Sequence, residues 1–258
     1  MLRTLLLLTL SILLCRAENL RTNYVFGGEK TFAAVAKTND PVTDKVAEHF
    51  YQKMYGKILL PMVEKFALEK KQLKFLEIGL GCDMEYGPGA SVKMWKKIFD
   101  GRDIDLWEAE YDAACVDKFK KEGHLKGIRT VTGDQGDNTV LKRWITETGG
   151  KFDVIVDDGG HKNHQILNTF LALWPELNEG GNYFIEDLQV SFRPSWTTFG
   201  FPAVTKVIQA WVEALHVGPK RVSDHQKHIL AQYPLPPDLD SIYCQKEACV
   251  LHKEDPVR

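Results

Sequence analysis

The chain has 258 residues, of which 44% are hydrophobic and 26% charged, and its formal net charge is −2 at pH 7. This length accommodates one sizeable hydrophobic core, and the composition is ordinary for a soluble globular protein. Basic and acidic residues are interleaved without a basic stripe, so the charge pattern argues against a nucleic acid as partner.

The first residues resemble a secretory signal. A short positive start, Met1–Arg3, precedes an apolar run from Leu5 to Cys15, and Cys15–Ala17 offers small residues where signal peptidase cleaves. The run is about 11 residues long, shorter than the roughly 20 that a membrane-spanning helix needs. We therefore predict a signal peptide over residues 1–17 and a secreted or lumenal protein in the secretory pathway. An uncleaved signal anchor is the alternative, and no further membrane insertion is expected.

Four cysteines remain after such a cleavage: Cys82, Cys115, Cys244 and Cys249. An oxidising compartment permits disulfides, and four cysteines allow three connectivities among which the sequence does not choose. Cys244 and Cys249 flank a four-residue segment and are placed to meet across a hairpin turn. Free thiols stay an open alternative, and the spacing does not match a zinc site.

Residues 18–70 are predicted to form an N-terminal helical segment. Apolar residues recur at helical spacing from Thr43 to about Lys70, with Asp44 as the candidate cap. Pro61 predicts a break into two helices.

From residue 71 to the C-terminus the pattern predicts one α/β domain. Strands are expected over 74–79, 103–108, 128–131, 152–156 and 182–185, and helices over 91–99, 113–122, 138–147, 164–173 and 204–215. Regular alternation favours a mostly parallel sheet with helices on both faces. Residues 241–244 and 248–252 predict a closing antiparallel hairpin, which brings the sheet to seven strands.

Ligands bind beyond the carboxyl ends of the strands in such a sheet, and the unusual polar clusters fall there. The first expected strand ends in Glu77, and Gly79 and Gly81 allow a tight turn and close approach of a ligand. A third glycine at the dinucleotide position is missing, so a plain turn is the alternative. After the second strand, Glu110, with Glu108 as second choice, is suited to accept hydrogen bonds from a ribose diol.

The cluster after the third expected strand contains Asp134 and Gln135. Their side chains are candidates for hydrogen bonds with an adenine edge or with other polar groups of a ligand. Taken alone, this segment is equally typical of a turn.

Acidic residues follow the fourth and fifth expected strands. Asp157 and Asp158 end the fourth strand, and Glu186 and Asp187 end the fifth. Neighbouring parallel strands bring these carboxylates to one edge, where they repel one another unless a cation intervenes. Magnesium prefers oxygen ligands and zinc prefers histidine and cysteine, so Asp158, Glu186 and Asp187 are predicted as a magnesium site. His161 is predicted as a general base, although a loop polar group or a helix cap is the alternative for each residue.

Five segments occur in order: Phe75–Gly81, Gly87–Trp95, Gly133–Gln135, Phe152–His161 and Ile185–Asp187. Together they resemble the metal-dependent sugar O-methyltransferases of macrolide and aminocoumarin biosynthesis, over about residues 72–190, and the cephalosporin hydroxylase-like group shares this layout. The family usually has Asp-Asp-Gly-Ser-His, whereas Gly160 stands here in place of the serine. Those bacterial enzymes are cytoplasmic, whereas this chain has a predicted signal, so their substrates are not carried over.

The resemblance implies a Rossmann-like class I fold that binds S-adenosylmethionine. It assigns to the methyl-donor pocket Glu77, Gly79, Gly81, Glu110, Asp134, Gln135 and Asp157. It implies Mg²⁺ at Asp158, Glu186 and Asp187, with His161 as the base.

The predicted function is magnesium-dependent methyl transfer from S-adenosylmethionine to a hydroxyl of a small molecule or sugar. The aromatic residues of segment 191–201 suggest a lid, or alternatively a loop packed on the core. One rival is a nicotinamide-dependent oxidoreductase, which the missing third glycine disfavours. Another is a catalytically silent binding protein with the same fold. Homo-oligomerisation stays open.

Overall fold

The computed structural model describes residues 28–256, so the predicted signal peptide over residues 1–17 lies outside the described residues. The chain divides into two compact units. The first comprises the described residues up to Lys71 together with Lys93–Asp103, and the second comprises Gln72–Val92 and the chain from Ile104 onward. The predicted domain boundary at residue 70 stays a prediction.

The first unit is helical. Besides a helix over residues 28–36, it contains α2 (Asp44–Ala47), α3 (Gln52–Met54), the π-helical turn η1 (Tyr55–Leu59) and α4 (Leu60–Glu69). The predicted break at Pro61 is wrong, because this proline lies in the first turn of α4 and the helical run continues from α3. The wider π turn directly before it accommodates a residue without an amide hydrogen. The predicted cap is also wrong, because Thr43 occupies the N-cap position and Asp44 lies in the first turn.

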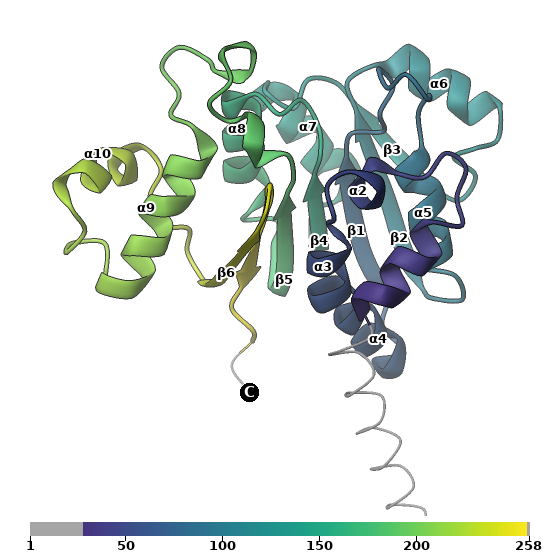
Figure 1. Ribbon diagram of the computed structural model, residues 1–258, viewed down its shortest axis with the longest axis horizontal. Coiled ribbons are helices and arrows are strands. Elements are labelled where there is room, and N and C mark those ends of the chain that lie inside the picture. The colour runs from purple at the N-terminus through teal and green to yellow at the C-terminus, as the bar shows by residue number, and fades with distance from the viewer. Residues whose placement is uncertain (1–27, 257–258) are drawn as a thin grey trace, which may run out of the picture. The chain divides into compact units, whose positions relative to one another are not determined.

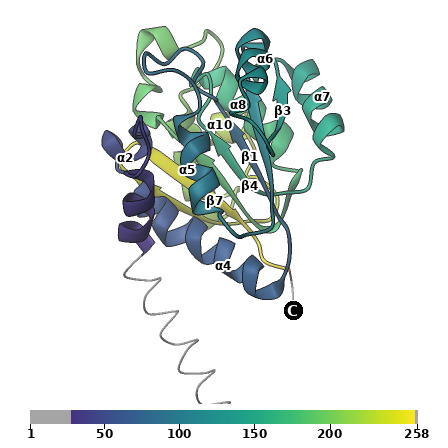
Figure 2. The same cartoon turned by 90° about the vertical axis from the view of Figure 1, so that its right-hand side faces the viewer.

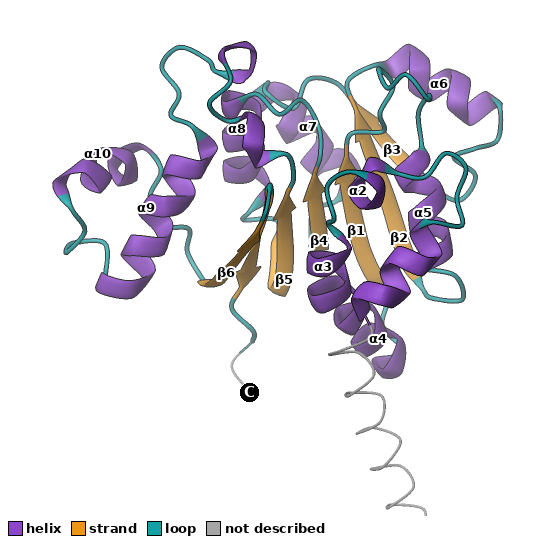
Figure 3. Cartoon of the chain, in the orientation of Figure 1, coloured by secondary structure: helices purple, strands orange, loops and turns teal. Residues whose placement is uncertain are grey.

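The second unit contains a seven-stranded sheet in the order β3-β2-β1-β4-β5-β7-β6 (Figures 1 and 3). Its strands are β1 (Leu73–Ile78), β2 (Ile104–Glu110), β3 (Arg129–Thr132), β4 (Phe152–Asp157), β5 (Leu177–Ile185), β6 (Leu239–Gln245) and β7 (Ala248–Lys253). The first five strands are parallel, and β7 runs antiparallel to both β5 and β6. The predicted fold class is therefore confirmed. The strand order reverses between β1 and β4, which is where such sheets bind ligands.

The helices that connect and follow these strands are α5 (Ala90–Ile98), α6 (Ala113–Lys121), α7 (Asn138–Thr148), α8 (Asn163–Leu173), α9 (Val204–Val217) and α10 (Asp224–Gln232). Figure 2 shows α6 and α7 beside β3, which both helices contact. Helix α10 was not predicted from the sequence. None of its residues is buried, so its sequence has no apolar stripe to mark it as a helix.

One face of the sheet packs against α7, α8 and α9. The ring of Phe170 lies 5.0 Å from that of Tyr183 and 4.9 Å from that of Trp211, which joins β5 to two helices. Helix α6 buries Val116 and Phe119 outside this cluster, so that helices cover both faces of the sheet. Among the residues that the structure describes, none of the helices is both long and apolar enough to cross a membrane.

Two disulfides resolve the connectivity that the sequence left open. Cys82 pairs with Cys115 across 33 positions of the chain, and Cys244 pairs with Cys249 between register partners of β6 and β7. The first joins the loop after β1 to α6, whereas the second closes a hairpin.

Removing the first disulfide is expected to destabilise the protein more than removing the second. In the chain-entropy model, closing the longer loop contributes about 4 kcal/mol and closing the short hairpin about 2 kcal/mol. Denaturant unfolding of the paired variants C82S/C115S and C244S/C249S, without reductant, measures both losses. Equal losses, or a larger loss in the hairpin variant, would contradict this expectation.

Candidate active site

The turn after β1 is in close contact with the turn after β4. Gly79 has a φ of +109°, and a Cβ atom there would lie 2.1 Å from the backbone oxygen of Asp158. The amide of Gly79 donates to the carbonyl of Ala109 in β2, and the amide of Asp158 donates to the carbonyl of Ile78. Only glycine satisfies both the backbone angle and the contact, so Gly79 fixes how closely the three strand ends approach.

Gly79→Ala is therefore expected to lower the free energy of unfolding by about 3 kcal/mol, through a left-handed residue and a backbone clash. Gly87 is the matched control, because its φ is +84° and an added Cβ would meet nothing within 4 Å. Gly87→Ala is expected to cost only about 1 kcal/mol. Urea unfolding of both variants measures the two losses in the free energy of unfolding. Equal losses would show that the chain accommodates a Cβ atom next to Asp158 at little energetic cost, against this prediction.

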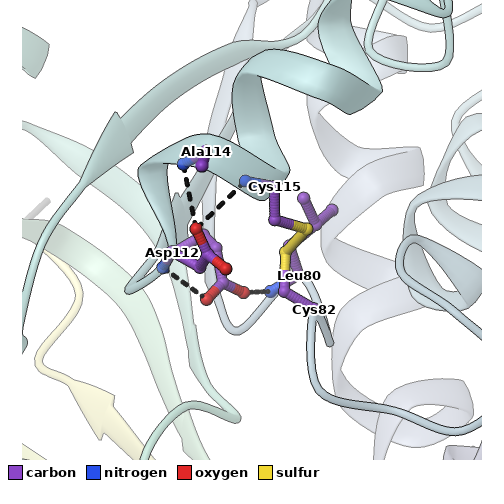
Figure 4. The surroundings of a disulfide bond; sticks show 6 residues. Leu80, Cys82, Asp112, Ala114 and Cys115 are labelled. Carbon is purple, nitrogen blue, oxygen red and sulfur yellow. Dashed lines mark hydrogen bonds between the residues drawn. A yellow bond between two sulfur atoms is a disulfide. The ribbon is translucent and has the colours of Figure 1, made fainter.

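The carboxylate of Glu110 bridges the loops that follow β1 and β2. Its Oε2 accepts a hydrogen bond from the amide of Leu80 at 3.0 Å, and its Oε1 accepts one from the amide of Asp112 at 3.0 Å. Asp112 in turn caps α6, because its Oδ1 accepts from the amides of Ala114 and Cys115 (Figure 4). The residue predicted to hold a ribose is thus buried and held in place from both sides.

Other residues predicted for the donor pocket also lie at this edge. The Oε2 atom of Glu77, at the end of β1, accepts from the hydroxyl of Ser91 at 2.7 Å. Oδ1 of Asp134, after β3, accepts from the amide of Gly136 and from Nε2 of Gln165. The structure therefore brings these side chains to the predicted edge, while their contacts with a ligand stay predictions.

Gln135 and Asp157 bind each other rather than facing an open space. Nε2 of Gln135 donates to Oδ1 of Asp157 at 2.9 Å, and its Oε1 accepts from the amide of Gly160 at 2.7 Å. Both side chains are buried. Gln135 therefore positions the turn after β4, a role that the sequence did not reveal.

Burial raises the pKa of Asp157 to about 6, and the hydrogen bond from Gln135 together with the nearby His161 opposes this rise. The hydroxyl of Tyr183 lies 3.4 Å from Oδ2 of Asp157. Burial, reinforced by the negative charge of Asp157, raises the pKa of Tyr183 well above its ordinary value. A buried carboxylate with a raised pKa next to the carboxylate of Asp158 is typical of functional sites.

Asp158, His161 and Asp187 converge on one point. One ligand atom from each lies within 4.8 Å of the others, and all three residues are half-buried. Nε2 of His161 lies 3.5 Å from Oδ2 of Asp187 and 3.9 Å from Oδ1 of Asp158. The two carboxylates offer the oxygen ligands that Mg²⁺ prefers, so they fit the predicted metal, and the imidazole lies beside them where a base is expected.

Two of these three residues have an uncommon backbone conformation. His161 has a φ of 54° and Asp187 a φ of 55°, both in the left-handed region that non-glycine residues rarely occupy. Such conformations concentrate at functional sites, where the surrounding structure holds them. Here they occur in the turns after β4 and β5, where they place both side chains in one cluster.

Glu186 is the predicted metal ligand that lies outside the group formed by Asp158, His161 and Asp187. It is buried, and its amide donates to the carbonyl of Asp157 at 3.0 Å. Its role as a ligand stays a prediction.

Segment 191–201 lies beside the cluster. The ring of Trp196 meets that of His161 edge-on, with 5.8 Å between centroids. Phe192 is 61% exposed and Phe199 is fully exposed, so these two rings are not packed on the core as the alternative interpretation required. The 3₁₀ turns η2 (Leu188–Val190) and η3 (Pro194–Trp196) shape the path of the chain here.

A cavity of about 380 Å³ opens between this segment, α9 and α10, and its lining includes Phe192, Phe201, Lys206 and His225. Asn163 holds its wall together, because its side chain binds the carbonyl of Ser191 and the amide of Val204. Sequence analysis missed Asn163, since a single asparagine at the start of a helix looks like an ordinary capping residue.

Sequence comparison finds similar O-methyltransferases, although no family model matches the chain. Mycinamicin VI 2''-O-methyltransferase of Micromonospora griseorubida is 37% identical over 128 residues, which are 49% of this chain and 30% of that protein. The 8-demethyl-8-alpha-L-rhamnosyl tetracenomycin-C 2'-O-methyltransferase of Streptomyces olivaceus is 30% identical over 155 residues, 60% of this chain and 37% of that protein. The chain thus spans about a third of the length of these curated relatives.

Structure comparison finds MycE methyltransferase of mycinamycin biosynthesis, in complex with Mg and SAH. Its TM-score is 0.65 at 22% identity, and the alignment covers 87% of this chain and 54% of MycE. The fold of this chain is therefore that of a Rossmann-like class I methyltransferase.

Proposed function

We propose that this chain is an S-adenosylmethionine-dependent O-methyltransferase that requires a divalent cation, with Mg²⁺ as the expected ion. Its acceptor is a hydroxylated small molecule or sugar. The observation that supports this most directly is the convergence of Asp158, His161 and Asp187 at the carboxyl edge of a methyltransferase sheet. The similar proteins are named as O-methyltransferases, one of them acting on a rhamnosyl tetracenomycin, which supports the same reaction class.

The donor side of the site is formed by the loops after β1, β2 and β3. Gly79 and Gly81, both at positive φ, shape the tight turn that the donor is expected to contact, and Glu110 offers its remaining lone pairs to the two hydroxyls of a ribose. Asp134 lies one loop further along the edge, where the nucleobase is expected.

The acceptor side of the site is formed by the turns after β4 and β5. Asp158 and Asp187, with Glu186 as a further predicted ligand, would hold the cation, which when bound lowers the pKa of an acceptor hydroxyl. Nε2 of His161 takes the proton of that hydroxyl as its oxygen bonds to the donor methyl carbon, and the sulfur keeps the electron pair of the broken bond. Trp196 contacts the ring of His161 edge-on, where we expect it to limit the access of water to the base.

His161→Ala is expected to lower the rate of methyl transfer about 100-fold or more while S-adenosylhomocysteine binds as before, because the imidazole lies with Asp158 and Asp187 on the acceptor side of the site. A methyl-transfer assay with hydroxylated acceptors and Mg²⁺, paired with titration calorimetry, measures both quantities. His164→Ala is the matched control, since His164 contacts Thr198 instead of the carboxylates. A full rate in the His161 variant would remove this residue from the mechanism.

Asp187→Asn is expected to weaken Mg²⁺ binding and to lower activity with it, because it removes a charged ligand without changing the size of the side chain. Titration of the apoprotein with Mg²⁺ measures the first effect. The same titration on His161→Ala separates a base from a metal ligand: unchanged Mg²⁺ affinity supports the base, and lost affinity assigns His161 to the metal. Unaltered activity of the Asp187 variant in EDTA would contradict the proposed metal site.

Two other functions remain as rivals. A nicotinamide-dependent oxidoreductase and a silent binding protein are both compatible with the sheet, and calorimetry separates them from the proposal. Binding of S-adenosylhomocysteine without any turnover over a broad acceptor panel would favour the silent protein. Binding of a nicotinamide dinucleotide instead would favour the oxidoreductase, and binding of neither would contradict the methyltransferase.

We also propose that the protein acts in the secretory pathway. The apolar run before Ala17 and the two disulfides support this, because disulfides persist in oxidising compartments. When the full chain is expressed in a eukaryotic host, mass spectrometry is expected to find a lumenal or secreted product that lacks the first 17 residues. A cytosolic product that retains Met1 would contradict the proposal.

A further inference from the structure

We infer that the Cys82–Cys115 disulfide is a positioning device for the methyl-donor pocket, so that breaking it weakens donor binding in a chain that stays folded. The inference rests on the proposed function, because it concerns the same pocket. It assigns a role to two cysteines that lie outside the ligand set and outside the core.

The disulfide joins two of the loops that form the proposed donor pocket. Cys82 directly follows Gly81 in the turn after β1, and Cys115 lies in the first turn of α6, five residues after Glu110. The Cα atoms of the cysteines are 6.2 Å apart although 33 positions separate them in the chain. The bond therefore fixes the distance between the glycine turn and the acidic residue that is expected to bind ribose.

The disulfide closes a ring with the hydrogen bonds of Glu110. Starting at Leu80, the ring passes through Cys82 and Cys115 to Asp112, whose carboxylate accepts from the Cys115 amide at 3.0 Å. It returns through Glu110, which accepts from the amides of both Asp112 and Leu80 (Figure 4). Every connection in this ring is either covalent or a hydrogen bond to a carboxylate, so the two loops hold each other.

The backbone hydrogen bonds within the loop after β1 close its own turns, as between Gly89 and Leu80, whereas the disulfide joins this loop to the one after β2. Between β1 and α5 the chain forms only turns, with Gly81, Gly87 and Gly89 all at positive φ. A loop of this kind loses conformational freedom when it binds a ligand, and a cross-link that removes this freedom beforehand strengthens binding.

Both cysteines are half-buried, so a small thiol can reach the bond in the folded protein. Dithiothreitol is such a thiol, and it reduces the S–S bond in two thiol–disulfide exchange steps. Cys82 and Cys115 gain two electrons and two protons as thiols, and dithiothreitol leaves as its cyclic disulfide. Besides the C82S/C115S variant, chemical reduction therefore gives a second way to break the disulfide, without a change in sequence.

The test compares S-adenosylhomocysteine binding in the oxidised full chain, in C82S/C115S and in C244S/C249S, by titration calorimetry without metal. The dissociation constant is expected to rise about tenfold in C82S/C115S and to change less than about twofold in C244S/C249S. The second variant is the matched control, because it removes a disulfide of the hairpin at the other edge of the sheet. Circular dichroism at the titration temperature verifies that each variant is folded.

As a second measurement that leaves Cys82 and Cys115 in place, the wild-type chain is titrated before and after dithiothreitol, and C244S/C249S receives the same treatment as the control. An increase in the dissociation constant that appears on reduction in wild type and in C244S/C249S alike supports the inference. A folded, reduced chain that binds as tightly as the oxidised one would overturn it.

A kinetic measurement distinguishes positioning from general damage. Breaking the Cys82–Cys115 disulfide is expected to raise KM for the methyl donor. The value of kcat at saturating donor and the affinity for Mg²⁺ are expected to stay within about twofold, because the metal cluster lies in the turns after β4 and β5. Equal losses in all three quantities would assign the disulfide a merely structural role. If the oxidised wild-type chain binds no S-adenosylhomocysteine, the proposed function fails and the inference fails with it.

Discussion

The close contact between Gly79 and the backbone of Asp158 is the constraint on which the site depends. Because residue 79 has no side chain, the ends of β1 and β4 approach one another at the point where the strand order reverses. The donor loop after β1 and the acidic turn after β4 then lie on the two sides of a single backbone contact. A methyl donor and an acceptor must meet within bonding distance, and this contact is what brings their expected pockets together.

Charge is distributed unevenly along this edge. Carboxylates lie at the end of each of the five parallel strands or in the loop that follows, yet the surroundings that stabilise their charge differ between the two halves of the edge. On the donor half, the carboxylate of Glu110 is stabilised by backbone amides, which leaves it buried without a cation. On the acceptor half, Asp158 and Asp187 share a histidine in strained turns, an arrangement that a divalent cation would stabilise further. Acidic side chains therefore have two roles at this edge: Glu110 holds two loops together, whereas Asp158 and Asp187 are candidates to bind a cation.

Most of the fold could be predicted because its signals are local. Buried parallel strands have continuous apolar runs, and the intervening helices have an apolar stripe, so the seven strands and helices α5 to α9 followed from pattern alone. The exposed α10 and the helical path through Pro61 could not be predicted, since one has no stripe and the other depends on a π turn. The edge position of Asp158 and His161 followed from topology, whereas the buried pairing of Gln135 with Asp157 depends on side-chain geometry that no spacing encodes.

The disulfides show how such a fold adapts to the compartment that the N-terminus suggests. The class I sheet orders its core through burial, but its ligand loops are irregular and partly exposed, so hydrophobic burial contributes less to ordering them. In an oxidising environment a cross-link between two such loops persists, and it constrains them without occupying space in the pocket. Cys82 and Cys115 lie beside the glycine turn and the acidic residue rather than in the core, where a bond would add little to helices already packed. Their position therefore favours a role in ligand binding over a role in holding the sheet together.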